Sequence, residues 1–541
     1  MDTSSAFDAI IIGSGLGGLI AGAHLSQAGR RVQLLERHDK FGGAATTFKR
    51  RDLQVEVSLC IMDGLDDMDF KTPIFKKLGM LDSLSMVTPD DFFNLRHPLL
   101  GSDFVMPFGY ERAIDVCKCR FPHHLKAIQT YFSTIRNLRN ARNNQLIHQL
   151  KSGTTPLSDL ADCAWGGAET FWSDEKLTES IWRANKISMG RFLQVLFGND
   201  EAVKFALCAN LHFIASNLDH ISLFDFALSQ ASYHFGAHYA RGGSQKLSDH
   251  LVALIRNAGG EALCRREVTR IHVQQNRAVG VEHQKVSVIA SGKPVTHSDP
   301  KNSYASIILG NATPGAIKNM LSEPERQAFF APYEGIPATT SNWSIYLGFD
   351  RKPEYYGVEH YANFIYPEWL DSMKKIPESC TVMGLVPGSK IPPFMFCDYS
   401  RLGEMVSDNG ISLGVMHWLD QLCNWDSFLD EETYQLHKKN WIGVMIQVLD
   451  QTFPGIKESI VFHEMATPRT VKAYLNDPLG SVHGFTDPEL LKLGKKSSSG
   501  SRTGVQGLLL ASSFAFGPGY SKAVLAGTLA AEMAFKELQR R

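Results

Sequence analysis

The clearest pattern of apolar and polar positions lies at the start of the chain. Residues 9–12 are an unbroken apolar run, Ala-Ile-Ile-Ile, which is short enough for a buried parallel strand. After a Gly-rich turn, apolar residues return at helical spacing from Leu19 to Leu25, and Gly29 marks a natural helix end. The segment 31–35, Arg-Val-Gln-Leu-Leu, predicts another strand. The pattern therefore predicts a strand, a helix and a second, parallel strand.

The turn between the first strand and the helix has the spacing G-x-G-x-x-G, and an acid ends the second strand. In a dinucleotide-binding unit, the first glycine makes a tight turn, the second lets backbone approach a pyrophosphate, and the third lets helix and strand pack closely. The helix N-terminus attracts the phosphates, and the acid accepts hydrogen bonds from a ribose. An ordinary Gly-rich turn is the alternative. The sequence thus predicts a dinucleotide site at Gly13, Ser14, Gly15, Leu16, Gly17, Gly18 and Glu36.

A second pair of glycines follows soon after Glu36 and is not part of the minimal NAD-binding unit. An acid, a Gly-Gly pair and a nearby threonine in this order resemble the flavoprotein family of amine oxidases, phytoene desaturases, carotenoid isomerases and retinol saturases. The resemblance implies FAD as a noncovalent cofactor, whereas a surface turn is the simpler alternative. It also implies that the FAD site continues through Arg37, Gly42, Gly43, Ala44 and Thr47.

A segment in the middle of the chain extends the resemblance. A Gly-Gly turn at 242–243, a helix and two strands near 267–271 and 278–281 are similar to the second nucleotide-binding segment of this family. The resemblance implies that the backbone of Val268 binds the adenine ring. It also implies that a further strand ends near the cofactor at Asn311 and Ala312.

The C-terminal segment is similar in order and spacing to carotenoid isomerases, retinol saturases and phytoene desaturases. A strand precedes a Gly-x-Gly turn and a long helix rich in small residues. By this resemblance the first N–H groups of the helix face the flavin, and Ser512, Gly517, Gly519 and Tyr520 contact the cofactor. Relatives usually have an acid where this chain has Ser512. Tyr520 and Lys522 are candidates for a catalytic or substrate contact, with exposure to solvent as the alternative.

A strand predicted near residues 52–59 shows a further departure from the family. Glu56 and Ser58 match the acid and the small residue expected there, but Cys60 stands where a histidine is common. No residue in the sequence is identified as an obligatory acid or base.

The length of 541 residues is too great for one hydrophobic core, so we expect two domains. We predict an α/β fold with a discontinuous, Rossmann-type FAD-binding domain (GR2-like) formed by residues 1–70, 236–320 and 459–541. An α+β substrate-binding domain is predicted from residues 71–235 and 321–458.

Aromatic residues recur densely through a mainly helical stretch of the second domain, 165–235. Core packing is the default interpretation, and a lining for a hydrophobic substrate is the alternative. Alternation at 343–349 predicts a strand of an antiparallel sheet, which commonly floors the substrate cavity in the family that this chain resembles.

Charge and cysteine content exclude some classes of protein. Lys plus Arg number 55 and Asp plus Glu 56, which gives no electrostatic reason to expect nucleic acid. Nine cysteines without framework spacing suit a reducing compartment. Neither the cysteines nor the histidines show zinc-ligand spacing, so we predict no metal site.

The sequence predicts a cytoplasmic protein, because it shows no signal peptide and no apolar run of membrane-spanning length. An arginine-rich helical stretch bears on membrane contact. We expect its polar side chains to form a solvated helix face, and peripheral contact with lipid headgroups is the alternative. These side chains are Arg136, Arg139, Asn140 and Arg142.

Our leading hypothesis is an FAD-dependent oxidoreductase that acts on carbon–carbon bonds of a lipophilic unsaturated substrate. Desaturation, saturation or isomerisation of a polyene, a carotenoid or retinoid, or a fatty-acyl compound fits the resemblance. A flavin-dependent amine or amino-acid oxidase and a non-catalytic lipid-binding escort protein of the same fold are the alternatives. The substrate, the direction of the reaction, the electron acceptor and the oligomeric state stay open.

Overall fold

The computed structural model describes residues 7–151, 183–288, 294–336, 339–482, 484–485, 501–517 and 519–540. The predicted aromatic stretch at 165–235 is therefore described from residue 183 onward. Trp172 and Trp182 lie outside the described residues.

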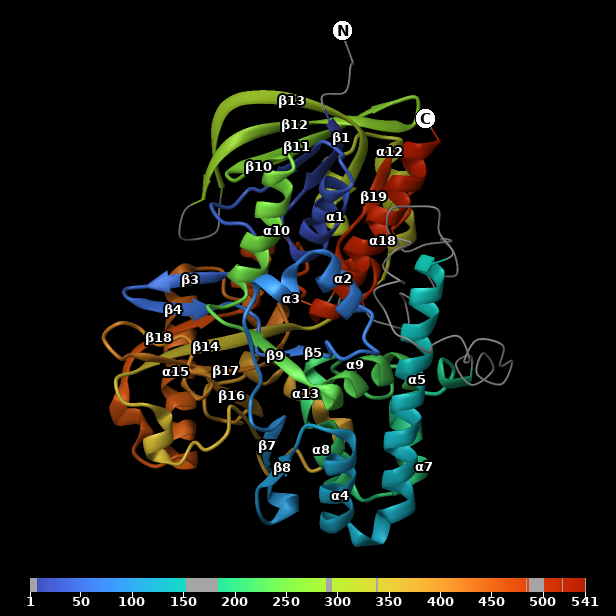
Figure 1. The fold of residues 1–541 in the computed structure, drawn as a ribbon. Helices are drawn as coiled ribbons and strands as arrows, with labels where there is room; N and C mark the ends of the chain where they lie inside the picture. The colour runs from blue at the N-terminus through green and yellow to red at the C-terminus, as the bar shows by residue number, and fades with distance from the viewer. Residues whose placement is uncertain are drawn as a thin grey trace.

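The first sheet contains the nucleotide-binding unit that the sequence predicts, at the top of Figure 1. β1 (Phe7–Ile12), α1 (Leu16–Gln27) and β2 (Val32–Leu35) follow one another in the predicted order. Five strands are parallel, in the order β10 (Glu261–Leu263), β2, β1, β13 (Pro294–Gly310) and β19 (Leu508–Leu510). This order is that of a Rossmann sheet. The predicted α/β class with a Rossmann-type domain is confirmed.

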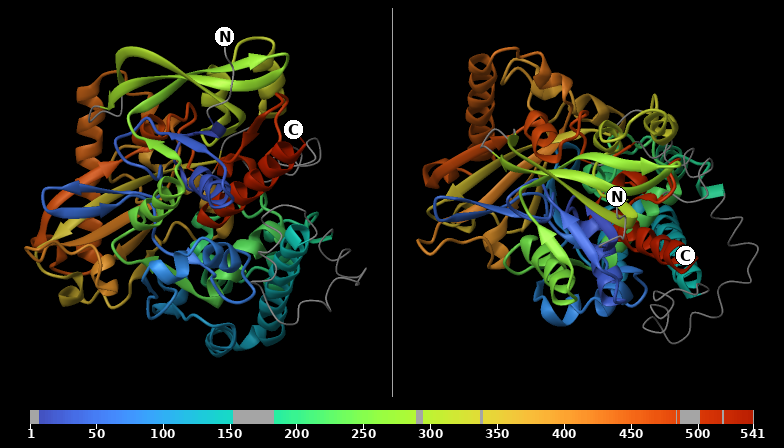
Figure 2. Two further views of the ribbon diagram at one scale, coloured as in Figure 1. Left: turned by 45° about the horizontal axis from the view of Figure 1, so that its top comes forward. Right: turned by 90° about the horizontal axis from the view of Figure 1, so that it is seen from above.

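An antiparallel ribbon continues from the parallel sheet. β11 (Arg266–Gln274) pairs with β12 (Arg277–Val288), and β12 pairs with the first half of β13, whose second half joins β1. Figure 2 shows this ribbon crossing above the helices of the domain. The predicted strand pair at 267–271 and 278–281 is therefore present. α10 (Gln245–Asn257), α11 (Pro314–Asn319) and α12 (Glu325–Phe330) also belong to this part of the molecule.

The C-terminal helix α18 (Gly519–Gln539) packs directly against α1. The two backbones approach so closely that side chains would not fit between them. A Cβ atom on Gly527 would lie 2.2 Å from the carbonyl oxygen of Gly17, and one on Gly17 would lie 2.0 Å from that of Ala511. The small residues of the predicted terminal helix therefore serve close helix packing, which brings the N-termini of α1 and α18 to the same side of the sheet.

The second sheet is mainly antiparallel and lies below the first in Figure 1. The strand predicted at 343–349 is its β14, and α15 (Glu431–Thr452) packs against β18. β18 lies in the segment 459–541 that the sequence suggests for the first domain, but it pairs with β14 in this sheet. Seven strands run in the order β18 (Ile460–Ala466), β14 (Ser341–Phe349), β17 (Ser412–Asp420), β16 (Phe394–Asp398), β15 (Ala362–Ile365), β7 (Phe93–Arg96) and β8 (Phe104–Met106).

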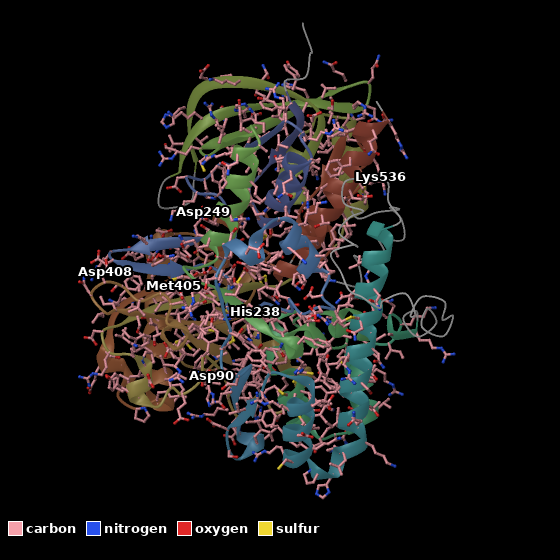
Figure 3. All side chains as sticks on the ribbon, in the orientation of Figure 1. Asp90, His238, Asp249, Met405, Asp408 and Lys536 are labelled. Atoms are coloured by element: carbon pink, nitrogen blue, oxygen red, sulfur yellow. The ribbon has the colours of Figure 1, made fainter. Side chains whose placement is uncertain are left out.

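Shorter elements join and surround the two large sheets. β3 (Thr47–Arg50) and β4 (Leu53–Glu56) form a hairpin, and β9 (Ala237–Ala240) pairs with β5 (Met62–Asp63) and β6 (Met86–Val87). Figure 3 shows His238 of β9 at the waist of the molecule, where its ring contacts the carbonyl oxygen of Gly64 at 3.0 Å. The remaining helices are α2 (Lys71–Lys77), α3 (Met80–Ser83), α4 (Tyr110–Arg120), α5 (Leu125–Lys151), α7 (Met189–Phe197), α8 (Glu201–Cys208), α9 (Leu223–Phe235), α13 (Ile376–Ser379), α14 (Cys423–Asp426) and α16 (Pro468–Leu475).

The arginine-rich stretch forms α5, but its polar side chains do not form the solvated face expected from the sequence. Arg139 is fully buried and pairs with Asp66 and Asp69. Lys71, also buried, donates to Asp69 at 2.7 Å and lies 3.5 Å from Asp63. The expectation of a solvated face is therefore wrong for Arg139, because three carboxylates from a loop distant in sequence neutralise two buried cations. Burial of this kind also excludes lipid headgroups as partners of Arg139.

This buried network leads to a prediction for folding stability. Replacing Arg139 with alanine should lower the free energy of unfolding by about 3–5 kcal/mol, because it leaves buried carboxylates without their partner. Arg136→Ala is the matched control on the same helix. Its side chain is partly exposed and pairs with the exposed Glu111, so the loss should be below about 1 kcal/mol. Urea unfolding of the two variants measures the difference, and equal losses would contradict the role given to Arg139.

Candidate dinucleotide and substrate site

One large cavity, of about 2150 Å³, lies between the first sheet and the second. Ligand pockets are commonly about 300–1,000 Å³. This cavity therefore has room for more than one ligand. It is lined by the Gly-rich turn, the loop after β2, the N-terminus of α18 and the facing strands of the second sheet.

The Gly-rich turn is held in shape by Glu36, which is buried at the end of β2. One carboxylate oxygen of Glu36 accepts hydrogen bonds from the backbone N–H of Ser14 at 2.8 Å and from its hydroxyl at 2.6 Å. The other accepts from the N–H of His38 at 2.8 Å. Glu36 therefore orders the turn as well as facing the cavity.

A residue from the far side of the sheet completes the turn. The Asn311 side chain donates to the carbonyl oxygens of Gly13 at 3.2 Å and Gly15 at 2.9 Å. A Cβ on Gly15 would lie 2.9 Å from the same amide nitrogen, and one on Gly18 would lie 2.7 Å from the Gly13 carbonyl oxygen. These glycines therefore let the turn close tightly against Asn311 and against its own backbone.

The second Gly pair lies directly against the first turn. Gly42 forms a parallel bridge with Gly15, and its N–H donates to the Ser14 hydroxyl at 3.0 Å. Gly42 has φ +123°, and a Cβ there would lie 2.2 Å from the Ala45 carbonyl oxygen. The two glycine motifs thus form one continuous backbone surface.

A segment whose role the sequence did not reveal closes the Glu36 end of the cavity. Arg37 donates to the Ala473 carbonyl oxygen at 2.5 Å, and Nε2 of His38 lies 2.7 Å from the carbonyl oxygen of Tyr474. The His38 and Tyr474 rings also stack, with centroids 4.3 Å apart. The C-terminal end of α16 therefore covers the part of the cavity beside Glu36.

The Gly-rich turn, the second Gly pair and the N-terminus of α18 together form a cradle along one side of the cavity. The N-terminus of α18 is the end of this cradle that lies opposite Glu36. Ser512, Gly519, Tyr520 and Lys522 all line the cavity. The Tyr520 hydroxyl lies 3.2 Å from that of Ser58, which itself donates to the Ala44 carbonyl oxygen at 2.7 Å. Burial, and after it the nearby Glu56, raises the pKa of Tyr520, so this phenol is neutral. Tyr520 and Ser58 therefore connect the second Gly pair to the terminal helix.

The second sheet forms the floor of the cavity on one face. Ser344 and Tyr346 of β14 and Val415 and His417 of β17 line it, in agreement with their cross-strand pairing. Further apolar and aromatic side chains come from the helices opposite. These are Phe213, Ile214, Phe224, Leu228 and Tyr233.

The cavity brings together most of the site residues that the sequence predicts. Gly18 and Gly517 are the exceptions, since neither lines it. Gly18 packs against Asn311, and Gly517 is a buried turn residue with φ +108°. Their contacts with a cofactor, like those of the other predicted residues, stay predictions. The sequence did not predict three further residues that line the cavity, Cys60, Arg142 and His417. A sequence signal existed only for Cys60, which stands where the resemblance predicts a histidine.

Comparison with known proteins finds one matching family and several relatives that cover most of the chain. The family described as an NAD(P)-binding Rossmann-like domain matches residues 11–76. All-trans-retinol 13,14-reductase of Danio rerio is 24% identical over 505 residues, covering 88% of this chain and 77% of that protein. Prolycopene isomerase 1 of an Oncidium hybrid is 23% identical over 88% of this chain and 75% of its own. Phytoene desaturase (neurosporene-forming) of Rhodobacter capsulatus is 22% identical over 97% and 93%.

The chain is thus similar, over most of its length, to a retinol 13,14-reductase, a prolycopene isomerase and a phytoene desaturase. Like these relatives it is an enzyme, of the oxidoreductase class. The resemblance stated from the sequence is therefore confirmed, and it extends over nearly the whole chain rather than about half of it.

Solved structures agree on the fold. An oxidoreductase from Methanosarcina mazei has a TM-score of 0.57 at 14% identity, covering 96% of this chain and 99% of its own. Wild-type putrescine oxidase has a TM-score of 0.58 at 13% identity, covering 99% of both chains. At these identities the likeness concerns the fold alone. Over the described residues, no helix is both long and apolar enough to cross a bilayer.

Proposed function

We propose that the protein is an FAD-dependent oxidoreductase that acts on carbon–carbon double bonds of a lipophilic, unsaturated substrate. The observation that carries this proposal is the single cavity, which joins a dinucleotide cradle at one side to an apolar, aromatic lining at the other. Relatives named for reactions of retinol, prolycopene and phytoene support the same class of substrate.

The residues of the cradle fit FAD. Bare backbone at Gly13, Gly15 and Gly42 offers close approach to a pyrophosphate. The hydroxyl of Ser512 is buried, lines the cavity and has no hydrogen-bond partner among the described residues. Buried polar atoms are nearly always paired, so a ligand group is the expected partner of this hydroxyl. The cradle suits FAD better than NAD, because it continues through the second Gly pair to the terminal helix.

The chain's own groups position the cofactor and supply the field around it. Glu36 would bind the ribose of the adenosine while α16 covers it, and the N-terminus of α1 would face the phosphates. The N-terminus of α18 would offer a partial positive charge that stabilises the negative charge of a reduced flavin. FAD, when bound, supplies hydride transfer. The apolar lining holds the substrate against it and excludes water.

The two alternatives draw less support from the site. An amine oxidase shares the fold, but the likeness to putrescine oxidase is at 13% identity and concerns the fold alone. A non-catalytic escort protein has no need of an intact dinucleotide cradle with an unpaired hydroxyl in it.

The proposed function predicts a yellow protein whose flavin responds to polyenes. Purified protein, reconstituted with FAD if necessary, should show flavin absorbance. Retinol, prolycopene and phytoene, each incubated with oxidised and with dithionite-reduced enzyme under anaerobic conditions, should give at least one altered product by chromatography. Benzylamine and putrescine serve as amine controls. Absence of flavin uptake would contradict the cofactor, and flavin reduction by an amine alone would favour the alternative enzyme.

Glu36 should contribute strongly to FAD affinity. Glu36→Ala removes a charge-assisted hydrogen bond, which is worth about 1.5–3 kcal/mol, so the Kd for FAD should rise about 10- to 150-fold. Titration of apoprotein with FAD, followed by flavin fluorescence, measures this change. Glu359→Ala, at an exposed glutamate outside the cavity, is the control. A Kd within twofold of the wild type for Glu36→Ala would refute the assignment.

Lys522 tests whether the substrate has an anionic group. It lies in the first turn of α18, where a cation opposes the helix dipole by a few tenths to about 1 kcal/mol. It is half-buried and lines the cavity, and none of the described carboxylates forms an ion pair with it. We expect it to bind a carboxylate or similar group on an otherwise apolar substrate.

Lys522→Met should therefore raise KM for a polyene carboxylic acid much more than for its methyl ester. Lys536→Met is the matched control, because Lys536 lies near the C-terminal end of the same helix (Figure 3), does not line the cavity and pairs with Glu532. Equal changes in KM for the acid and the ester would leave Lys522 without a part in recognition.

A further inference from the structure

Three residues from distant parts of the chain meet at the floor of the cavity. Cys60 follows β4, Cys397 lies on β16 and His417 lies on β17. Their sulfur and ring-nitrogen atoms all lie within 4.8 Å of one another, and Cys60 Sγ is 3.4 Å from His417 Nε2. Cys397 pairs with Val415 and Met395 with His417, so strand alternation puts Cys397 and His417 on the same face of the sheet. The cluster is therefore a product of the fold of the second sheet.

The loop that carries Cys60 is held in place by two tyrosines of the second sheet region. Tyr361 donates to the carbonyl oxygen of Cys60 at 2.7 Å, and Tyr399 donates to that of Leu59 at 2.8 Å. Two residues earlier, Ser58 contacts Ala44 and Tyr520 of the cofactor cradle. Cys60 is thus fixed between the cradle and the floor, where a substrate would meet the cofactor.

The three side chains differ in their access to the cavity. Cys60 and His417 are half-buried and line it, whereas Cys397 is fully buried behind them. A hydrogen bond from the Cys397 thiol, and after it the adjacent His417, holds the pKa of Cys60 well below its ordinary value. Burial raises the pKa of Cys397, which therefore stays a neutral donor. All eight cysteines in the described part of the chain are free thiols.

We propose that Cys60, paired with His417, is the general acid–base group of the reaction and that Cys397 is a positioning residue for its sulfur. The proposal rests on the proposed function, since it names the group that moves the substrate proton at that site. The thiol of Cys60 and the imidazole of His417 have the geometry that the reaction needs, because both face the cradle and the apolar lining. Such groups work best when their pKa lies near the working pH.

The step balances in atoms and electrons. Saturation of one carbon–carbon double bond takes a hydride, which carries both electrons, and a proton. Reduced FAD, if held in the cradle, would supply this hydride, and its oxidation would balance the reduction of the double bond. The S–H bond of Cys60 breaks, its electron pair stays on sulfur, and a C–H bond forms at the carbon next to the one that receives hydride. The thiolate is stabilised by Cys397 and His417 and regains a proton from water. Desaturation is the reverse, with the thiolate as base.

Other titratable groups that surround Cys60 and His417 are tyrosines and a histidine. Burial raises the pKa of the surrounding tyrosines, so each stays a neutral phenol near pH 7. His212 packs its ring against that of His417 at 5.1 Å. The tyrosines are Tyr233, Tyr346, Tyr361, Tyr399 and Tyr520.

A chemical test of the pair does not depend on knowing the substrate. The rate of alkylation of Cys60 by iodoacetamide, followed by peptide mapping from pH 5 to 10, should show a midpoint below the ordinary thiol value of about 8.5. His417→Asn should raise that midpoint by about one unit or more. Cys397→Ala should also raise the midpoint, whereas Cys397→Ser keeps a hydrogen-bond donor and should leave the midpoint near the wild-type value. The exposed Cys423 in the same digests is the internal control, and its alkylation profile should be the same in every variant.

A kinetic test connects the pair to turnover. Cys60→Ser is nearly isosteric and should keep the FAD content, the visible spectrum and the melting temperature. Its kcat on the active polyene should fall about 10²–10⁴-fold, as expected for loss of a general acid–base group. Cys423→Ser should leave kcat unchanged.

The possible outcomes separate this proposal from the proposed function. Lack of turnover by the wild-type enzyme on every polyene would contradict the proposed function, while a low, His417-dependent midpoint would still support the pair. An ordinary midpoint for Cys60, or an unchanged kcat in Cys60→Ser, would overturn the pair. Stoichiometric zinc in the purified protein that is lost in Cys60→Ser would also overturn it, because the thiolate would then be a metal ligand.

Discussion

The close contact between α1 and α18 is the constraint on which the rest of the structure depends. Helices usually pack 8–10 Å apart with side chains between them. Here Gly17, Gly527 and the end of β19 meet as backbone, and a single added methyl group would lie about 2 Å from a carbonyl oxygen. The N-terminus of α1 and that of α18, 500 residues apart in sequence, therefore open onto one cavity, and both can act on one ligand.

The polar groups of the protein are arranged around this cavity in two different ways. Those in the cradle, such as Glu36 with Ser14 and Asn311 with the Gly-rich turn, hold backbone in a shape that suits a dinucleotide. Those of the buried network around Arg139 and Lys71 satisfy each other, and Ser521 of α18 donates to Asp63 within it at 2.6 Å. The network thus ties the first turn of the terminal helix to α5 and the loop after β5. The terminal helix is therefore in direct contact with the buried network of the substrate side.

The second sheet lies opposite the cradle and provides the floor of the cavity. The cradle comes from the first sheet and the floor from the second, so changes in the floor alter what lies against the cofactor without disturbing its binding. In this chain the floor carries His417 and, beside it, Cys60, at a place where the family commonly has a histidine. A chain with a different residue at either position would keep the fold and the cofactor cradle but move a proton differently, or not at all.

Much of the nucleotide-binding part was determined by the sequence alone, because its signals are local. An apolar run, a Gly-rich turn, a helix and an acid within 30 residues specify β1, α1, β2 and Glu36, and their spacing carries the chemistry of phosphate and ribose binding. The family resemblance was equally readable, since it rests on short motifs.

The tertiary structure alone decided the features that depend on distant contacts. A helical stretch with four polar side chains reads as a solvated face, and only the fold places Asp66 and Asp69 against Arg139. The contact of Tyr474 with His38 and the pairing of β18 in the second sheet have no local signal either. Cys60 and His417 are 357 residues apart, and the thiol and the imidazole become one chemical unit only because β17 pairs with β16 beneath the loop after β4.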